Sequence, residues 1–284
     1  MAPFLVWQHR RVRFATIRTP DGTRAARVEG DTLVELDARD VGELLARAGD
    51  GPETGTRYDL AAADFAPVVT HPGKIICQGL NYRNHILEMG HELPTHPTLF
   101  AKFREALIGA HDDIVLPASS HAVDWEAELA LVIGTRVRHA SPAQAADAIA
   151  GFTVANDVSM RDWQHRSLEW LQGKTWDRST PVGPWLVTAD EVGGAEPDLE
   201  IRCEVDGAVR QASRTSELVF SSPELVAYAS EFVTLEPGDL LLTGTPAGVG
   251  HGMHPPTYLA PGQIVRTVIG HIGELRNACR PEIP

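Results

Sequence analysis

Short apolar stretches separated by turn-forming residues limit the fold of this sequence more than any other feature. The clearest covers residues 125–133, which alternate at their start and continue as an apolar run typical of a buried strand. Helix starts are few: Ser141-Pro142 and Ser222-Pro223 each place a serine before a proline, a pattern that favours the first helical turn. Because strands and helices do not alternate regularly, we expect a β-rich α+β fold and not a doubly wound sheet.

The remaining elements are predicted from the same patterns of alternation and helical spacing. Asp206-Gly207 predicts the turn of a β-hairpin, whereas residues 50–57, rich in Gly, Pro and Thr, are interpreted as a loop or linker. Further strands are expected at residues 11–14 (extending to 17), 26–29, 33–36, 74–77, 100–103, 114–116, 152–156, 198–205, 208–212, 239–243 and 263–269, and further helices at 41–47 and 84–90.

The composition excludes several classes of protein. Lys plus Arg is 25 and Asp plus Glu is 38, so the formal net charge is −13, and no overall positive field exists that would hold nucleic acid. No apolar run approaches the ~18–20 residues that a membrane-spanning helix needs. The length of 284 residues allows one large domain or two smaller ones. We therefore expect neither nucleic acid nor a membrane as a partner.

The cysteines and the N-terminus suggest a compartment. Cys77, Cys203 and Cys279 are widely spaced and form no CxxC pair, so a thiolate zinc site is not expected and the thiols are interpreted as buried and reduced. Residues 1–11 place a short apolar stretch before basic residues, the reverse of the order in a signal peptide. These features predict a cytoplasmic protein.

Two glutamates in the strongest predicted strand suggest a metal site. Glu126 and Glu128 lie two residues apart, so their side chains share one face. Neighbouring carboxylates repel unless a cation lies between them or one is protonated, and their oxygens suit Mg²⁺ or Mn²⁺. Asp157, at the end of the following apolar strand, is a candidate third ligand. The alternatives are a solvated strand face for the glutamates and a simple turn for Asp157.

A histidine and a glutamate on a short predicted helix suggest a general base. His85 and Glu88 are three residues apart and therefore close enough to touch. A glutamate beside a histidine fixes its tautomer and raises its basicity, which suits the activation of water. The alternative is an exposed pair with no chemical role.

Two further positions are candidates for binding an anionic substrate. Lys174 is surrounded by apolar and aromatic residues and could hold a carboxylate or an oxyanion, although a surface lysine on a loop has the same pattern. Thr245 lies in a glycine-rich stretch, residues 243–250, where backbone can approach a ligand closely. Such a stretch is also common in purely structural turns.

Six blocks, in order and with consistent spacing, make the sequence from about residue 73 onward resemble the fumarylacetoacetate hydrolase family. They are GLNYRNHILEMG, LFAKF, DWEAELALVIG, NDVSMRDWQ, GKTWDRSTPVGPW and TGTPAGVG. The resemblance implies a mixed β-sandwich roll as the catalytic domain, over residues 71–284, with a small N-terminal α/β domain over residues 1–70. Two departures, Trp176 for the usual Phe and Gln263 for the usual Asp, do not touch the proposed chemistry.

The resemblance also implies roles for the candidate residues. It makes Glu126, Glu128 and Asp157 the ligands of one Mg²⁺ or Mn²⁺ ion. It makes His85, Glu88 and Lys174 catalytic, with the helix of the first two closing over the ligand. It adds Arg161, Gln164 and Thr245 as substrate-binding residues.

The implied protein is a homodimeric, metal-dependent enzyme that acts on a small anionic dicarbonyl compound. The first hypothesis is hydrolysis of a C–C bond in an acylpyruvate-like or β-diketone substrate, through a stabilised enolate. The second is a decarboxylase or keto–enol isomerase of a 2-oxo diacid in aromatic or sugar-acid catabolism, since the same site stabilises an enolate. The third is a noncatalytic metal-binding module, against which the complete set of candidate residues argues.

Overall fold

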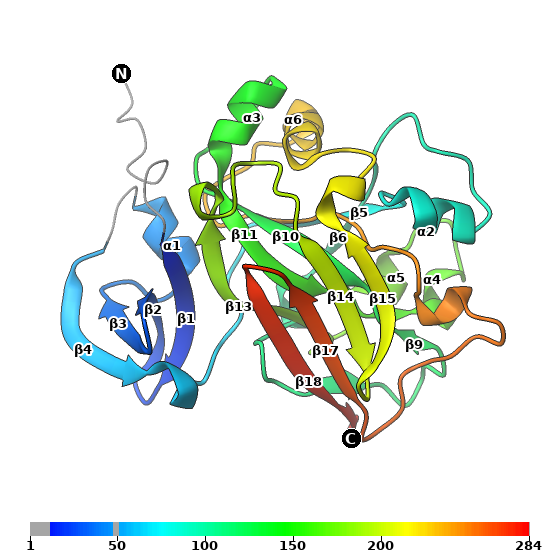
Figure 1. The fold of residues 1–284 in the computed structure, drawn as a ribbon, viewed down its shortest axis with the longest axis horizontal. Helices are drawn as coiled ribbons and strands as arrows, with labels where there is room; N and C mark the ends of the chain where they lie inside the picture. Colours follow the sequence, from blue (N-terminus) through cyan, green and yellow to red (C-terminus); the bar gives the residue numbers. More distant parts are fainter. Residues whose placement is uncertain (1–11, 48–50, 284) are drawn as a thin grey trace.

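The computed structural model describes residues 12–47 and 51–283, and its main element is a large mixed sheet (Figure 1). One short strand, β7 (Leu107–Ile108), pairs with β13 (Thr180–Thr188) outside the main order of strands in this sheet. That main order is β4 (Glu53–Asp59), β3 (Thr32–Leu36), β2 (Gly22–Glu29), β1 (Arg13–Thr19), β13 (Thr180–Thr188), β11 (Ile149–Asn156), β10 (Ala127–Ile133), β16 (Leu240–Leu242), β5 (Ile75–Gly79) and β6 (Thr98–Lys102).

A second sheet lies in front of β10 and β11 in Figure 1. Its order is β15 (Ala208–Arg214), β14 (Glu200–Val205), β17 (Ile264–Ile269), β18 (Gly273–Pro281) and β8 (Ile114–Leu116), and a small ribbon joins β12 (Ser159–Met160) to β9 (Val123–Asp124). The longer helices are α3 (Pro142–Ala148) and α6 (Ser222–Phe232), and the shorter ones are α1 (Val41–Ala46), α2 (Arg83–Glu88), α4 (Arg161–Gln164) and α5 (Leu171–Lys174). The β-rich sandwich predicted from the sequence is confirmed.

β10 is buried along its whole length and separates two apolar clusters. Leu129, Leu131 and Ile133 point into the core between the two sheets. Ala130 and Val132 point to the opposite face, into the cluster that also packs α1. Because alternate residues of a strand face opposite sides, this double burial explains the unbroken apolar run in the sequence.

The two proline-containing helix starts were predicted correctly. Ser141 caps α3 by accepting the N–H of Gln144, whose side chain reaches back to the Ser141 N–H. Ser221 and Glu224 form the equivalent capping box at α6. Such reciprocal bonds satisfy amide groups that the first helical turn leaves free.

One predicted loop is a strand. Residues 50–57 were expected to form a loop or linker, but Glu53–Asp59 forms β4 at the edge of the large sheet, paired with β3. Its side chains are almost all exposed, so the strand is held by backbone pairing and has no apolar alternation that the sequence could reveal. Residues 11 and 50 lie outside the described part of the chain.

The N-terminal strands extend the same large sheet that carries the metal-site candidates. β1 pairs antiparallel with β13, so β1–β4 continue the sheet beyond its centre, at the left of Figure 1. Two further sequence predictions concern burial and membranes. The thiols of all three cysteines are buried, as expected. Among the described residues no helix is long and apolar enough to cross a membrane.

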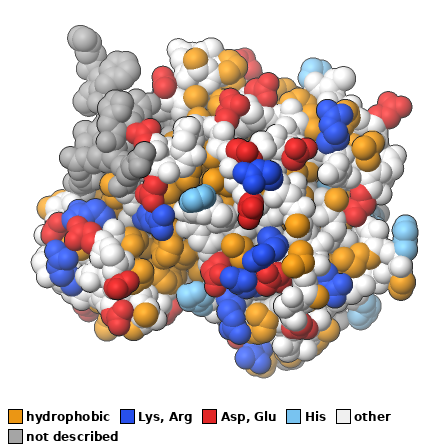
Figure 2. Space-filling model, in the orientation of Figure 1, with side chains coloured by type: hydrophobic (Ala, Val, Ile, Leu, Met, Phe, Trp, Pro, Cys, Tyr) orange, Lys and Arg blue, Asp and Glu red, His pale blue; other side chains and the backbone are white. Residues whose placement is uncertain are grey.

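Acidic and basic side chains lie side by side on the face that Figure 2 shows. Basic and acidic side chains are mixed there, and no large patch of one sign dominates this view. The second sheet supplies an example, because Arg266 contacts Glu274 at 2.5 Å and Glu204 at 3.3 Å from neighbouring strands. This face therefore offers no broad positive surface that would attract anions over a long range.

Candidate metal and substrate site

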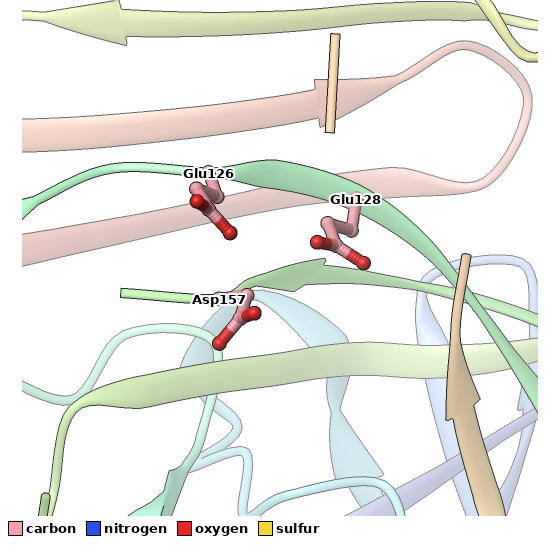
Figure 3. Close-up of side chains that lie close together, drawn as sticks. All are labelled: Glu126, Glu128 and Asp157. Carbon is pink, nitrogen blue, oxygen red and sulfur yellow. The ribbon is translucent and has the colours of Figure 1, made fainter. Parts of the chain in front are cut away.

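The pairing of β10 with β11 brings the three predicted metal ligands together. Ala127 pairs with Asn156, so Glu126 and Asp157 flank that pair, and the Asp157 N–H donates to the Glu126 carbonyl at 2.8 Å. Glu126 precedes β10, whereas the sequence placed it inside the strand. One carboxylate oxygen from each of Glu126, Glu128 and Asp157 lies within 4.8 Å of the others. Figure 3 shows the three side chains facing a common space.

Two buried lysines contact these carboxylates, although the chain has only three lysines in all. Lys174, the last residue of α5, places Nζ 2.5 Å from Glu126 Oε2 and 2.8 Å from Asp157 Oδ2. Lys102, the last residue of β6, places Nζ 2.5 Å from Asp157 Oδ1. Sequence reasoning found Lys174 but missed Lys102, whose signal was a charged residue ending an otherwise apolar strand.

Arg161 connects the acid triad (Glu126, Glu128 and Asp157) to a fourth buried acid. Its Nη2 lies 2.6 Å from Glu126 Oε1, and its Nε donates to Asp124 Oδ2 at 2.8 Å. Asp124, which sequence reasoning also missed, additionally accepts the N–H groups of Gly250 and His251. Gln164 Oε1 accepts from Arg161 Nη1 at 2.9 Å, which leaves the amide N–H₂ of Gln164 available to a ligand.

Burial and neighbouring charges shift the pKa values of the two glutamates of the triad in opposite directions. Burial by itself raises the pKa of Glu126, but the charges of Lys174 and Arg161 outweigh it and lower the pKa to about 2. Burial and the charges of Asp157 and Glu126 raise the pKa of Glu128 well above its usual value. Gly244 N–H donates to Glu128 Oε2 at 2.8 Å and offsets part of this rise. Glu128 is therefore the member of the triad with the least positive charge around it.

Glu88 fixes the orientation of His85. Its Oε2 lies 3.3 Å from His85 Nδ1, and both carboxylate oxygens accept the Gly248 N–H at 3.2 Å. Burial raises the pKa of Glu88, but the hydrogen bonds from His85 and Gly248 bring it below its usual value. A Cβ at Gly252 would lie 2.9 Å from Glu88 Cδ, so a larger residue there would displace the Glu88 side chain. His85 Nε2 is left free of this contact.

Seven of the nine predicted site residues line one cavity of about 60 Å³. The other two do not line the cavity. Asp157 is fully buried against Lys102 and Lys174, and Glu88 contacts His85. The Oγ1 of Thr245 accepts from Gln211 at 2.8 Å, so its own O–H can donate into the cavity. The seven lining residues are His85, Glu126, Glu128, Arg161, Gln164, Lys174 and Thr245.

The donor set fits a hard divalent cation. All three candidate ligands are carboxylates, the oxygen donors that Mg²⁺ and Mn²⁺ prefer, and no thiol of the described chain belongs to the cluster. Glu126, Glu128, Asp157 and Asp124 outnumber the cations Lys102, Lys174 and Arg161 by one. A divalent cation would therefore make the local charge positive, which suits an anionic substrate.

A family model described as fumarylacetoacetate hydrolase, C-terminal, matches residues 74–280. A mitochondrial oxaloacetate tautomerase of Rattus norvegicus is 46% identical over 215 residues, covering 75% of this chain and 68% of the relative. One from Xenopus laevis is also 46% identical, over 265 residues, covering 88% of this chain and 83% of the relative. The chain is therefore similar to curated relatives over most of its own length.

Solved structures agree with this relationship. A 2-hydroxyhepta-2,4-diene-1,7-dioate isomerase from Mycobacterium marinum superposes with a TM-score of 0.82 at 35% identity, covering 96% of this chain and all of that one. A fumarylacetoacetate hydrolase from Exiguobacterium antarcticum has a TM-score of 0.84 at 29% identity, covering 95% of this chain and all of that one. The mixed β-sandwich roll is thus shared with solved members.

One expectation from the sequence is wrong. The order of apolar and basic residues near the N-terminus predicted a cytoplasmic protein, but the curated relatives in rat and Xenopus laevis are named as mitochondrial. The order of apolar and basic residues over these few positions does not distinguish among compartments inside the cell. The remaining sequence-level identification holds: this chain belongs to the fumarylacetoacetate hydrolase family.

Proposed function

We propose that this protein is a metal-dependent keto–enol tautomerase of a short 2-oxo diacid such as oxaloacetate. One observation carries the proposal: a buried acid triad, a buried lysine and a glutamate-held histidine share one small cavity. The relatives named oxaloacetate tautomerases are 46% identical over most of the chain, which favours this reaction over C–C hydrolysis.

The side chains around the cavity suit a substrate with a carboxylate beside a carbonyl. Lys174 supplies a buried positive charge: burial by itself lowers its pKa, but the charges of Asp157 and Glu126 outweigh burial and raise the pKa above its usual value. The free N–H₂ of Gln164 and the O–H of Thr245 are donors for substrate oxygens. Such fixed donors in a closed site stabilise the negative charge of an enolate.

The acid triad would hold a Mg²⁺ or Mn²⁺ ion, which as a Lewis acid favours the enolate form of a bound 2-oxo acid. His85 Nε2 would take the proton from C3 of the keto form and return it to the C2 oxygen, so that no atom is gained or lost. Glu88 stabilises the imidazolium that exists between these two transfers.

The proposal is tested by comparing three reactions in one preparation with Mg²⁺ or Mn²⁺. These are tautomerisation of oxaloacetate, its decarboxylation, and C–C hydrolysis of a series of acylpyruvates. The expected result is a kcat/KM for tautomerisation at least about 10²-fold above that of either other reaction, as a site built for proton transfer gives. A larger kcat/KM for an acylpyruvate would reverse the assignment.

The second candidate is the hydrolase, which the geometry of His85 favours. A histidine with one nitrogen held by Glu88 and the other facing the cavity could equally deprotonate a water that attacks a carbonyl. His85→Ala would then remove hydrolysis of acylpyruvates while decarboxylation of oxaloacetate persists. Equal loss of both reactions would show that His85 does not act specifically on water.

The remaining expectations concern the assembly and the metal. From the family resemblance we propose that the protein is a homodimer. Sedimentation velocity at several protein concentrations tests this directly. Calorimetry with Mg²⁺, Mn²⁺ and oxalate tests whether the site assembles for a ligand, and metal binding without oxalate binding would favour a noncatalytic metal-binding module.

A further inference from the structure

The cavity is closed on one side by an indole ring. Its volume of about 60 Å³ is far below the roughly 300–1,000 Å³ of sites that take drug-sized ligands. Gly79, Phe100 and Trp170 lie together in its wall, on the same cavity as Lys174. Trp170 is therefore one of the aromatic side chains that bound the cavity.

Trp170 fits into this wall only because residue 79 is glycine. A Cβ at Gly79 would lie 2.2 Å from Trp170 Cζ3 and 2.8 Å from Cη2, distances that real Cβ atoms do not show. Gly79 is the last residue of β5, so the indole packs directly on the end of a central strand. This contact is a fixed feature of the wall, because β5 is paired on both sides.

The Trp170 indole also contacts a second aromatic ring of the wall. Its ring meets Phe100 edge-on, with centroids 5.6 Å apart, and Lys174 Nζ lies 4.9 Å from the Phe100 ring centroid. Trp170 caps α5, four residues before Lys174, and Gly173 lets α5 press against Gln164, since a Cβ there would come within 2.5 Å of Gln164 Cβ. The same short helix therefore positions both the lysine and the aromatic wall.

We propose that Trp170, seated on Gly79, limits the length of the substrate and restricts the site to short 2-oxo diacids. This inference rests on the proposed function for the identity of the reacting end. A chain longer than four carbons would extend into the space that the indole fills, and the ring cannot move toward β5. A steric clash with a wall that cannot recede excludes longer ligands, in addition to any loss of favourable contacts.

The test uses a series of ligands of increasing length, called the ladder below, whose binding can be measured without turnover. Calorimetry in excess Mg²⁺ gives the Kd of oxalate and of 2-oxo diacids with five, six and seven carbons. For the wild type, Kd should rise by at least about tenfold between the shortest and the longest, the scale of discrimination that one or more methylenes provide. Trp170→Ala should bind the seven-carbon acid at least about tenfold more tightly than the wild type does, with oxalate changed less than about threefold.

Two matched variants keep the test interpretable. Leu168→Ala truncates a side chain that is 98% exposed in the same segment, and it should leave the whole ladder unchanged. Gly79→Ala should lower the melting temperature because its Cβ displaces the indole, and Gly79→Ala combined with Trp170→Ala should recover much of that loss. Should Trp170→Ala fail to fold, Trp170→Phe and the double variant still report on the ladder.

The outcomes separate this inference from the proposed function. A ladder that keeps its wild-type slope in Trp170→Ala, or one that weakens equally for every ligand, overturns the role of Trp170. A ladder that flattens as expected supports it, even in a protein that fails to tautomerise oxaloacetate. In that case the proposed tautomerase function is wrong, while the proposal that Trp170 limits the length of the ligand is supported.

Discussion

The Glu88 carboxylate joins the helix that carries His85 to the glycine-rich stretch 243–250, because it accepts the Gly248 N–H at 3.2 Å. The same carboxylate contacts His85 Nδ1 at 3.3 Å. One side chain thus orients His85 and ties α2 to the stretch that carries Gly248.

Glu88→Gln keeps an acceptor for Gly248 but removes the charge beside His85. We expect kcat for tautomerisation to fall by about 10²-fold, in the range of general acid–base effects, with the Kd for Mg²⁺ unchanged. Steady-state kinetics and metal calorimetry on the same sample give both values. A loss of metal affinity equal to the loss of kcat would instead make Glu88 a structural support of the triad.

Lys102→Met leaves the buried Asp157 carboxylate with one ammonium partner in place of two. Breaking a buried ion pair costs about 3–5 kcal/mol. Because Lys174 remains, we expect the free energy of unfolding to fall by about 3 kcal/mol. Weaker binding of Mg²⁺ should accompany it, because Asp157 loses the contact that orients its carboxylate.

Lys74→Met is the matched control for this prediction. Its ion pair with Asp239, at 2.7 Å, lies outside the cavity. The variant should therefore lower stability without changing the Kd for Mg²⁺. Equal metal affinities in the Lys102 and Lys74 variants would remove Lys102 from the site.

Glu43 makes stability depend on pH in the acid range. Hydrogen bonds from the Arg39 backbone and side chain lower its pKa to about 2. A carboxyl whose folded-state pKa is depressed stabilises the fold above its unfolded pKa, and this stability is lost as pH falls through 4.5 toward 2. Glu43→Gln should remove a contribution of about 1 kcal/mol or less, because the pair is largely solvated. Urea unfolding at pH 6 and pH 3 measures it, and an equal difference between the two proteins at both pH values would contradict the assignment.

The acid triad could be predicted from the sequence because each of its residues is fixed by a local pattern. Glu126 and Glu128 sit at the start of an apolar run, and Asp157 ends the next one, so antiparallel pairing of the two strands was enough to bring them together. Lys102 and Asp124 could not be found in this way. Their partners lie 55 and 37 residues away along the chain, and the one local signal, a charge at the end of the strand that carries Lys102, does not identify a partner.

The strands that were missed have equally specific reasons. β13 contains two prolines and a glycine, which normally indicate a turn, and β18 carries a polar pattern because it lies in the second sheet with one face toward solvent. β4 is held by edge pairing alone. In each case tertiary pairing outweighed a local propensity that pointed elsewhere.

The central claim is that the triad holds a divalent cation for the tautomerisation of a 2-oxo diacid. The most direct test is the rate at which enol-oxaloacetate converts to the keto form in Mg²⁺, measured for the wild type and for Glu126→Ala. We predict a saturable acceleration by the wild type, and for Glu126→Ala a rate equal to that of Mg²⁺ alone in buffer, with no metal binding. Mg²⁺-dependent turnover by Glu126→Ala, or a wild type no faster than buffer, would contradict the account.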